Sequence, residues 1–310
     1  DDASSFSMEA KRLLSWVGVA GDDLTFELQD SLVSVSDKKG SIRLPSFDPS
    51  EFPFWDKVFS ESEQTNKVSA LLLRDGFSAV KSFISTDETN QPSLCVSEYR
   101  SGGFWSMDQV VLSLLEIDGL ENCKLRIHGK NFGSLLSFLS LAEDEDDVQI
   151  YHHKNVSFFA LSDGSLFGES RFYSEFPEID FSTTGYNDVF DVSKEAVEEA
   201  LRRLIPGAPS DEEHVELCVQ DKSLTVSMNA VHGGIESMEV PLVGSFRNMG
   251  SYDGRGFRVS YKHLQKILSL YEENEVTISI RAQLPNGFLF FHREDERITH
   301  YMALIWKLAS

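Results

Sequence analysis

Apolar positions along this chain follow two spacings, one typical of amphipathic helices and the other typical of strands. Residues 130–141 place leucine and phenylalanine three and four positions apart, which predicts a helix with one buried face. Residues 148–151 and 156–161 are short apolar runs bounded by polar turns, which predicts strands. A helix followed by short antiparallel strands indicates an α+β fold.

The same arrangement recurs along the chain. Leu-Leu-Ser-Trp at residues 13–16 matches Leu-Leu-Ser-Phe at 135–138, at an offset of 122. Ser-Glu-Phe-Pro occurs at residues 50–53 and again at 174–177, at an offset of 124. A third helix, with Ile-Leu-Ser-Leu at 267–270, opens a similar stretch near the end. Two matches at nearly one offset indicate an internal repeat.

The repeat predicts five half-units of roughly 60 residues each. We expect residues 1–66 to form the second half of one domain, and residues 67–181 and 186–310 to form two complete domains. Polar stretches at 59–67 and 181–185 are interpreted as linkers. The period leads us to expect about 55 further residues ahead of the first one. The helices predicted in the five half-units cover residues 8–17, 75–85, 130–141, 194–205 and 261–271.

Acidic side chains far outnumber basic ones. The 50 acidic and 28 basic residues give a formal net charge of −22, which repels nucleic acid and membranes unless the bases gather on one surface. Three scattered cysteines lack the spacing of a zinc site and favour a reducing cytoplasm. No apolar run approaches the roughly 18 residues that a membrane-spanning helix needs.

Several polar groupings fail the requirements of catalysis or metal binding. His152 and His153 are consecutive on a predicted strand, so their side chains point to opposite faces and do not share a metal. The acidic run 143–147 lacks the spacing and glycine of a calcium loop, and residues 244–256 lack the lysine of a phosphate loop. We therefore expect no catalytic residue, no metal and no cofactor.

Three features together resemble the bacterial DNA polymerase sliding clamp, the replicase beta subunit family. They are the Phe-Pro that closes the first two domains, the helix-then-strands order in every half, and the closing segment Tyr301 to Leu308. The family's Thr-Asp-Gly-x-Arg-Leu segment appears here only as Met-Asp-Gln-Val-Val-Leu at residues 107–112. This departure makes a phage-encoded relative more attractive than a bacterial one.

The resemblance implies a ring whose interior is lined by the helices, with antiparallel sheets outside. Duplex DNA would pass through the hole without base-specific contacts, which requires a ring of modest positive charge. Acids concentrate in the predicted loops at 22–23, 143–147, 211–213 and 294–296. The expected DNA-binding residues on the predicted helices are Lys11, Arg12, Lys81, Lys130, Lys194, Arg202, Arg203, Lys262 and Lys266.

The resemblance also implies a cleft between the middle and last domains that receives short peptides from polymerase and loader subunits. Apolar, flexible side chains suit a groove that accepts several related peptides. Each such residue has an alternative role as ordinary core. By position, the lining is expected to be Leu94, Met107, Leu112, Phe181, Met302 and Leu304.

These expectations describe a non-enzymatic processivity factor in the cytoplasm of a bacterial or phage-infected cell. It would form a homodimeric ring on duplex DNA, loaded by an ATP-driven clamp loader, and would tether a DNA polymerase. Three alternatives remain open: a structural or scaffolding clamp-like protein of a virus or phage, a clamp homologue with a blocked hole, and an acidic hydrolase using Asp163 or His300.

Overall fold

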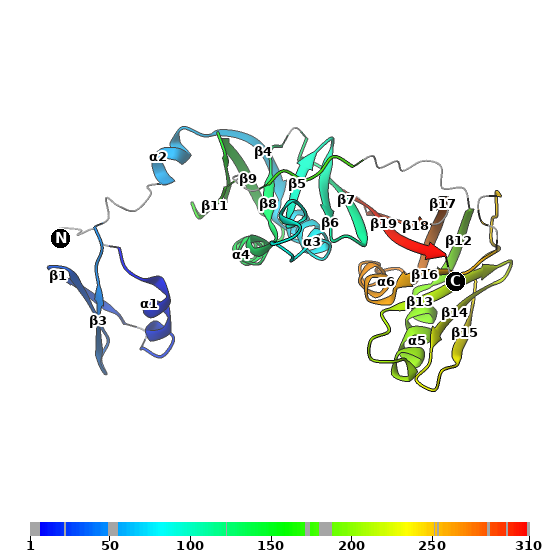
Figure 1. Ribbon diagram of the computed structural model, residues 1–310. Coiled ribbons are helices and arrows are strands. Elements are labelled where there is room, and N and C mark those ends of the chain that lie inside the picture. Colours follow the sequence, from blue (N-terminus) through cyan, green and yellow to red (C-terminus); the bar gives the residue numbers. More distant parts are fainter. Residues whose placement is uncertain are drawn as a thin grey trace. The chain divides into compact units, whose positions relative to one another are not determined.

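The computed structural model divides into two compact units, Asp1–Glu61 and Ser62–Ser310 (Figure 1). Within them the structure describes residues 7–21, 23–48, 55–121, 123–170, 174–179, 188–250, 252, 254–283, 286–295 and 297–308.

Unit 1 is a three-stranded antiparallel sheet with a helix against it. Val33, Val35 and Leu44 form its buried core, and no residue of helix α1 is buried. The turn between the second and third strands is held by Asp37, whose carboxylate accepts the amide hydrogens of Lys39 and Gly40 at 2.7 Å. The elements are α1 (Ala10–Val17), β1 (Thr25–Gln29), β2 (Leu32–Ser36), β3 (Ser41–Pro45) and α2 (Trp55–Ser60).

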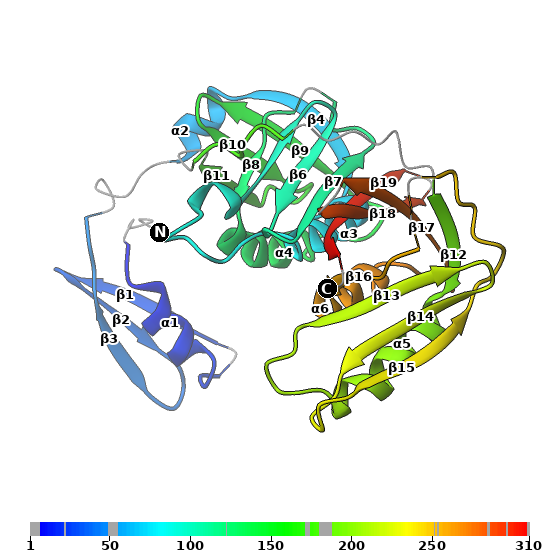
Figure 2. The ribbon, with the colours of Figure 1, turned by 45° about the vertical axis from the view of Figure 1, so that its right-hand side comes forward.

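Unit 2 repeats one order of elements, strand–helix–three strands, four times (Figures 1 and 2). Its first half holds β4 (Glu63–Ser69), α3 (Ala70–Lys81), β5 (Val96–Arg100), β6 (Gly103–Met107), β7 (Val111–Ile117), β8 (Arg126–His128), α4 (Phe132–Leu139), β9 (Asp147–His153), β10 (Val156–Ala160) and β11 (Leu166–Ser170). Its second half holds β12 (Asp188–Ser193), α5 (Lys194–Leu204), β13 (His214–Gln220), β14 (Ser223–Asn229), β15 (Ile235–Pro241), β16 (Phe257–Ser260), α6 (Tyr261–Leu268), β17 (Glu275–Gln283), β18 (Asn286–Asp295) and β19 (Ile298–Leu308). Single 3-10 turns occupy Pro92–Leu94, Gly129–Asn131 and Ile205–Gly207.

One antiparallel sheet runs through both halves of unit 2. Its strand order is β15-β14-β13-β16-β19-β7-β6-β5-β8, and β18, β17 and β12 continue from β19. The two halves meet where β7 pairs with β19, from Ile117 opposite Ile298 to Val111 opposite Leu304. A second sheet, β11-β10-β9-β4, completes the first half. The halves therefore share backbone hydrogen bonds as well as side-chain contacts.

The helices pack on these sheets through a dense aromatic and aliphatic core. The ring of Phe77 in α3 meets the rings of Phe104, Phe132 and Phe159 edge to face, at centroid distances of 5.2 to 6.2 Å. Gly76 allows α3 to lie close to β7, because a Cβ atom at this position would lie 2.5 Å from Ile117 Cδ1. The predicted helical periodicity therefore reflects real burial of one helix face.

The Ser-Glu-Phe-Pro motif has a visible role at residues 174–177. Phe176 is buried, its amide hydrogen is accepted by Glu98 at 2.9 Å, and its ring lies beneath the guanidinium of Arg100. Arg100 also donates to the carbonyls of Phe176 and Pro177, at 3.2 and 2.5 Å. The motif thus fastens the outgoing chain to the sheet. Its upstream copy lies outside the described residues.

Several predicted boundaries need correction. Residues 59–67 are not a linker, since they contain the end of α2 and most of β4. Helix α3 spans Ala70–Lys81, so it begins before the predicted range of 75–85 and ends within it. The apolar run 70–73 fits a strand and a buried helix equally well, which explains the error. Helix α5 begins at Lys194 as predicted, and Ser193 caps it, since its hydroxyl accepts the amide hydrogen of Ala196 at 3.2 Å.

Candidate nucleic-acid and partner surfaces

The helices of unit 2 lie together on one side of the strands. Helix α3 packs against α4, and α5 packs against α6 (Figure 2). Each helix buries its apolar side, as Val197, Leu201 and Leu204 do in α5, and leaves its polar side exposed. Polar residues on the outward helix faces are therefore available to a ligand.

Of the expected DNA-binding cations, Lys11 and Arg12 lie on α1 of unit 1, and the others lie on or next to the helices of unit 2. Most of them are already paired. Glu88 lies 2.7 Å from Lys130, and Glu213 lies 3.1 Å from Lys262. Exposed pairs of this kind contribute little to stability, so a phosphate can compete for the cation. The remaining partners are Glu9 for Arg12, Glu199 for Arg202 and Arg203, and the Tyr271 carbonyl for Lys194.

Two of the cations, Lys81 and Lys266, lie close together where the two halves of unit 2 meet. Lys266 Nζ in α6 lies 3.4 Å from the Ser82 carbonyl at the end of α3. Lys81, the preceding residue, is exposed and reaches over the start of α4, where a methyl group at Gly133 would lie 3.9 Å from its Nζ. Among the described residues, Lys81 has no hydrogen-bond or ion-pair partner. Lys130 lies in the 3-10 turn Gly129–Asn131, which leads into α4.

A buried carboxylate fixes the start of α4 and, with it, Lys130. Glu169 is 2% exposed and accepts hydrogen bonds from the His128 amide at 3.3 Å and from the Asn131 side-chain amide at 3.0 Å. Burial raises the pKa of Glu169, although these hydrogen bonds oppose the rise. The sequence gives no signal for this role, because Glu169 belongs to a distant strand.

Three of the expected partner-cleft residues lie together. Leu94, Met107 and Leu112 belong to one apolar cluster, which also contains Tyr301 and Ala303. The cluster lies along the β5–β6–β7–β19 part of the long sheet. Its partly exposed members, which include Leu94 and Met107, make it a candidate partner surface.

Met302 and Leu304 lie elsewhere. Both are completely buried, in the core beneath the helices of the second half. Side chains alternate along a strand, so Tyr301 and Ala303 face Leu112 while Met302 and Leu304 face the opposite side. Residues 301–306 are continuously apolar, so the sequence did not show which of these side chains face Leu112. Phe181 lies outside the described residues.

A polar contact that the sequence did not suggest links the two halves of unit 2. His263 Nε2 in α6 lies 2.9 Å from Asp108 Oδ2, in the turn between β6 and β7. Burial opposes ionisation of Asp108, but hydrogen bonds from His263 and the Val111 amide outweigh it and hold the pKa of that carboxyl below its ordinary value. Gln109 in the same turn has a φ of 80°, in the left-handed region that favours glycine.

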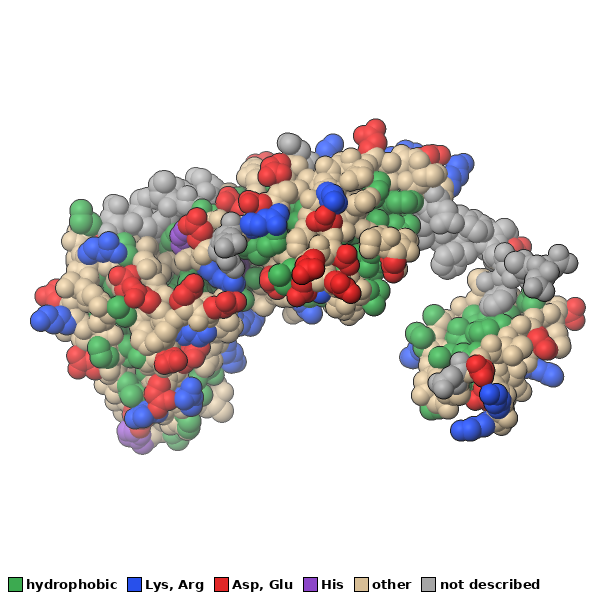
Figure 3. Space-filling model, turned by 180° about the vertical axis from the view of Figure 1, so that it is seen from behind, with side chains coloured by type: hydrophobic (Ala, Val, Ile, Leu, Met, Phe, Trp, Pro, Cys, Tyr) green, Lys and Arg blue, Asp and Glu red, His purple; other side chains and the backbone are tan. Residues whose placement is uncertain are grey.

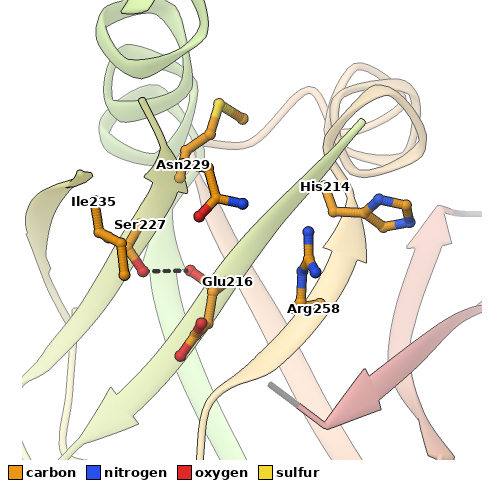
Figure 4. Close-up of a pocket in the computed structure, with 7 residues that line it drawn as sticks. His214, Glu216, Ser227, Asn229, Ile235 and Arg258 are labelled. Atoms are coloured by element: carbon orange, nitrogen blue, oxygen red, sulfur yellow. Dashed lines mark hydrogen bonds between the residues drawn. The ribbon is translucent and has the colours of Figure 1, made fainter. Parts of the chain in front are cut away.

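The sheet of the second half carries a polar hollow (Figure 4). Its donors are already engaged, because Glu212 binds Arg258 at 3.1 Å and the Asn229 amide at 2.6 Å. Neither a nucleophile–base pair nor a free cation is available in this hollow. The lining residues are His214, Glu216, Ser227, Met228, Asn229, Ile235 and Arg258.

Acidic and basic side chains intermingle on the surface drawn in Figure 3. Within the described ranges, no group of three or more His, Cys, Asp or Glu side chains is arranged to hold a metal ion. No helix in that part of the chain has the length and apolar character needed to cross a membrane.

Comparison with solved structures identifies the architecture. The DNA polymerase sliding clamp from Bacillus subtilis matches over 97% of this chain and 80% of its own, with a TM-score of 0.76 and 18% sequence identity. The DNA polymerase III beta subunit from Thermotoga maritima matches over 99% and 82%, with a TM-score of 0.78 and 15% identity. The chain has the sliding-clamp fold.

A third sliding-clamp structure, the DNA polymerase III beta subunit from Pseudomonas aeruginosa, gives a TM-score of 0.78 over 99% of this chain and 84% of that one, at 13% identity. No protein-family model matches the sequence, and no curated protein matches it. The resemblance expected from the repeats is therefore confirmed at the level of the clamp fold. Sequence identity this low to the matched clamps explains why the internal repeat is easier to recognise in this chain than any single motif of the family.

Proposed function

We propose that this protein is a DNA sliding clamp, which holds a DNA polymerase on duplex DNA without catalysing a reaction itself. The observation that carries the proposal is the clamp fold, which extends over 97 to 100% of the chain in the matched structures. The exposed cations on the helices support it, because weak contacts to phosphates allow a ring to slide. This function would place the protein in the bacterial cytoplasm.

A homodimeric ring would retain DNA by enclosing it. Closure needs free sheet edges, and β15 ends the long sheet of unit 2. An edge strand offers unpaired backbone groups to a second chain. Ile235 on β15 is 72% exposed, which suits an apolar contact at such an edge. We infer that β15 takes part in ring closure.

Polymerase and clamp-loader peptides would bind at the apolar cluster that contains Leu94, Met107 and Leu112. Partly exposed leucine and methionine side chains adapt to different apolar anchors. Phe181, in the segment between the halves, remains a predicted member of this surface. Met302 and Leu304, whose side chains are buried on the other face of β19, would support this surface from the core.

A second candidate is a clamp-like scaffold that does not slide on DNA. The ion pairs of Arg12, Lys130, Arg203 and Lys262 with nearby glutamates favour it, because paired cations contribute less to a positive lining. The two functions predict different results when the helix cations without an acidic partner are changed to acids. DNA binding weakens if the protein is a sliding clamp and does not depend on these positions if it is a scaffold.

Charge reversal at the helix junction tests the proposal. In Lys81→Glu/Lys266→Glu, duplex DNA affinity at low salt should fall by about tenfold or more, because two phosphate contacts become repulsive. Fluorescence anisotropy of a labelled duplex measures the affinity.

A matched control reverses two lysines in the β2–β3 turn. Lys38→Glu/Lys39→Glu changes the net charge equally at exposed positions outside the helices. It should lower the affinity by less than about threefold. Equal losses in the two variants would support the scaffold and contradict DNA contact through the helices.

A further inference from the structure

One contact joins the two surfaces described above. Asp108 follows Met107 in the candidate partner surface, and His263 lies on α6 between Lys262 and Lys266. His263 Nε2 and Asp108 Oδ2 are 2.9 Å apart, and the two side chains are 19% and 10% exposed. A partly buried contact of this kind is screened less by solvent than the exposed pairs on the helices.

Asp108 also organises the turn in which it lies. Its Oδ1 accepts the amide hydrogens of Val110 at 3.2 Å and Val111 at 2.9 Å, while Oδ2 faces His263. The backbone of Gln109 is in the left-handed region, with φ at 80°. One carboxylate therefore holds the turn with one oxygen and α6 with the other. Displacement of α6 changes the position of this carboxylate.

The imidazole of His263 is fixed from its other side. Its Nδ1 lies 2.8 Å from the hydroxyl of Ser260, the residue just before α6. A ring held at both nitrogens has little freedom to absorb a movement of the helix. The other polar tie from α6 to the first half, Lys266 to the Ser82 carbonyl, is exposed and would be released when Lys266 contacts a phosphate.

We propose that the Asp108–His263 pair couples DNA contact at α6 to the turn that carries Met107, so that bound DNA orders the partner surface. The inference rests on the proposed function. DNA held by Lys262 and Lys266 restricts α6, and the pair transmits this restriction to the turn. Coupling is reciprocal, so a peptide that orders the turn strengthens DNA contact by the same factor.

Hydrogen–deuterium exchange at the Val110 and Val111 amides tests this coupling, because both amides donate to Asp108. In the unmodified chain, a short duplex at low salt should slow exchange of these amides about threefold or more, together with amides of α6. In His263→Phe, which keeps a ring but has no donor, DNA should protect α6 while Val110 and Val111 exchange at an unchanged rate. His263→Leu repeats the comparison without the ring.

The matched control is Glu213→Gln, which removes the exposed partner of Lys262 but leaves the Asp108–His263 pair intact. This variant should keep the response of the unmodified chain. The coupling is overturned if His263→Phe and His263→Leu still respond, or if α6 of the unmodified chain is protected while Val110 and Val111 are not. If DNA fails to protect α6 at all, the DNA contact of the proposed function fails, and the inference fails with it.

Discussion

Buried polar side chains mark the joint between the two halves of unit 2. His300 on β19 is 1% exposed, and its Nε2 lies 2.7 Å from the Ser113 hydroxyl on β7. Desolvation, aided by the charge of Arg293, lowers the pKa of His300 to about 3. The ring is therefore neutral in the folded protein at physiological pH, and its hydrogen bond favours one pairing of the two strands.

The shift at His300 makes stability depend on pH. The unfolded chain protonates this imidazole near its ordinary value of 6.5, whereas the folded chain does so only near 3. Its contribution is fully present above pH 6.5 and is lost as the pH falls toward 3, at about 1.4 kcal/mol per pH unit. In His300→Gln, which does not titrate, the free energy of unfolding should fall less steeply between pH 6 and 4. Urea unfolding at several pH values measures it, and parallel curves would contradict this assignment.

At the scale of elements, the short distance between helix α3 and strand β7 limits which residues can occupy the helix. Helix α3 lies so near β7 that Gly76 leaves no room for a side chain, since an added Cβ would lie 2.5 Å from Ile117 Cδ1 and 3.1 Å from Leu115 Cδ2. Gly133 in α4 has more space, with Lys81 Nζ at 3.9 Å as its nearest neighbour. Close packing of α3 on the sheet thus requires Gly76, whereas the packing of α4 does not require Gly133.

Alanine at the two glycines should separate these roles. Gly76→Ala forces the β7 side chains aside and should lower the free energy of unfolding by about 1 to 3 kcal/mol. Gly133→Ala should be neutral or raise it by up to about 1 kcal/mol, because alanine favours the helix. Thermal or urea unfolding distinguishes them, and similar effects at both positions would show that α3 can move away from the sheet.

The sequence predicted elements better than it predicted contacts. The helices α1, α4, α5 and α6 and the closing strand follow from local periodicity, and α5 begins at Lys194 as expected. The start of α3 was missed because an apolar run at residues 70–73 does not distinguish a strand from a buried helix. Asp108 and His263 are 155 positions apart, and no local pattern brings them together.

At the scale of the whole molecule, the acidic side chains that give the net charge of −22 also lie beside the helix cations. Acids were expected to concentrate in loops such as 211–213, yet Glu213 of that loop pairs with Lys262, and Glu88 pairs with Lys130. Periodicity locates charges along a helix but not the loops that pack beside it. Lys81 and Lys266, which have no acidic partner among the described residues, lie where the two halves meet.

Retention on circular DNA tests the central claim most directly. After loading onto a nicked circular plasmid, a closed ring should co-elute with the DNA in gel filtration at moderate salt, because it is held by enclosure. Cutting the plasmid once should release the protein, which would slide off the ends. Equal retention on circular and linear DNA, or no retention on the circle after loading, would contradict the account.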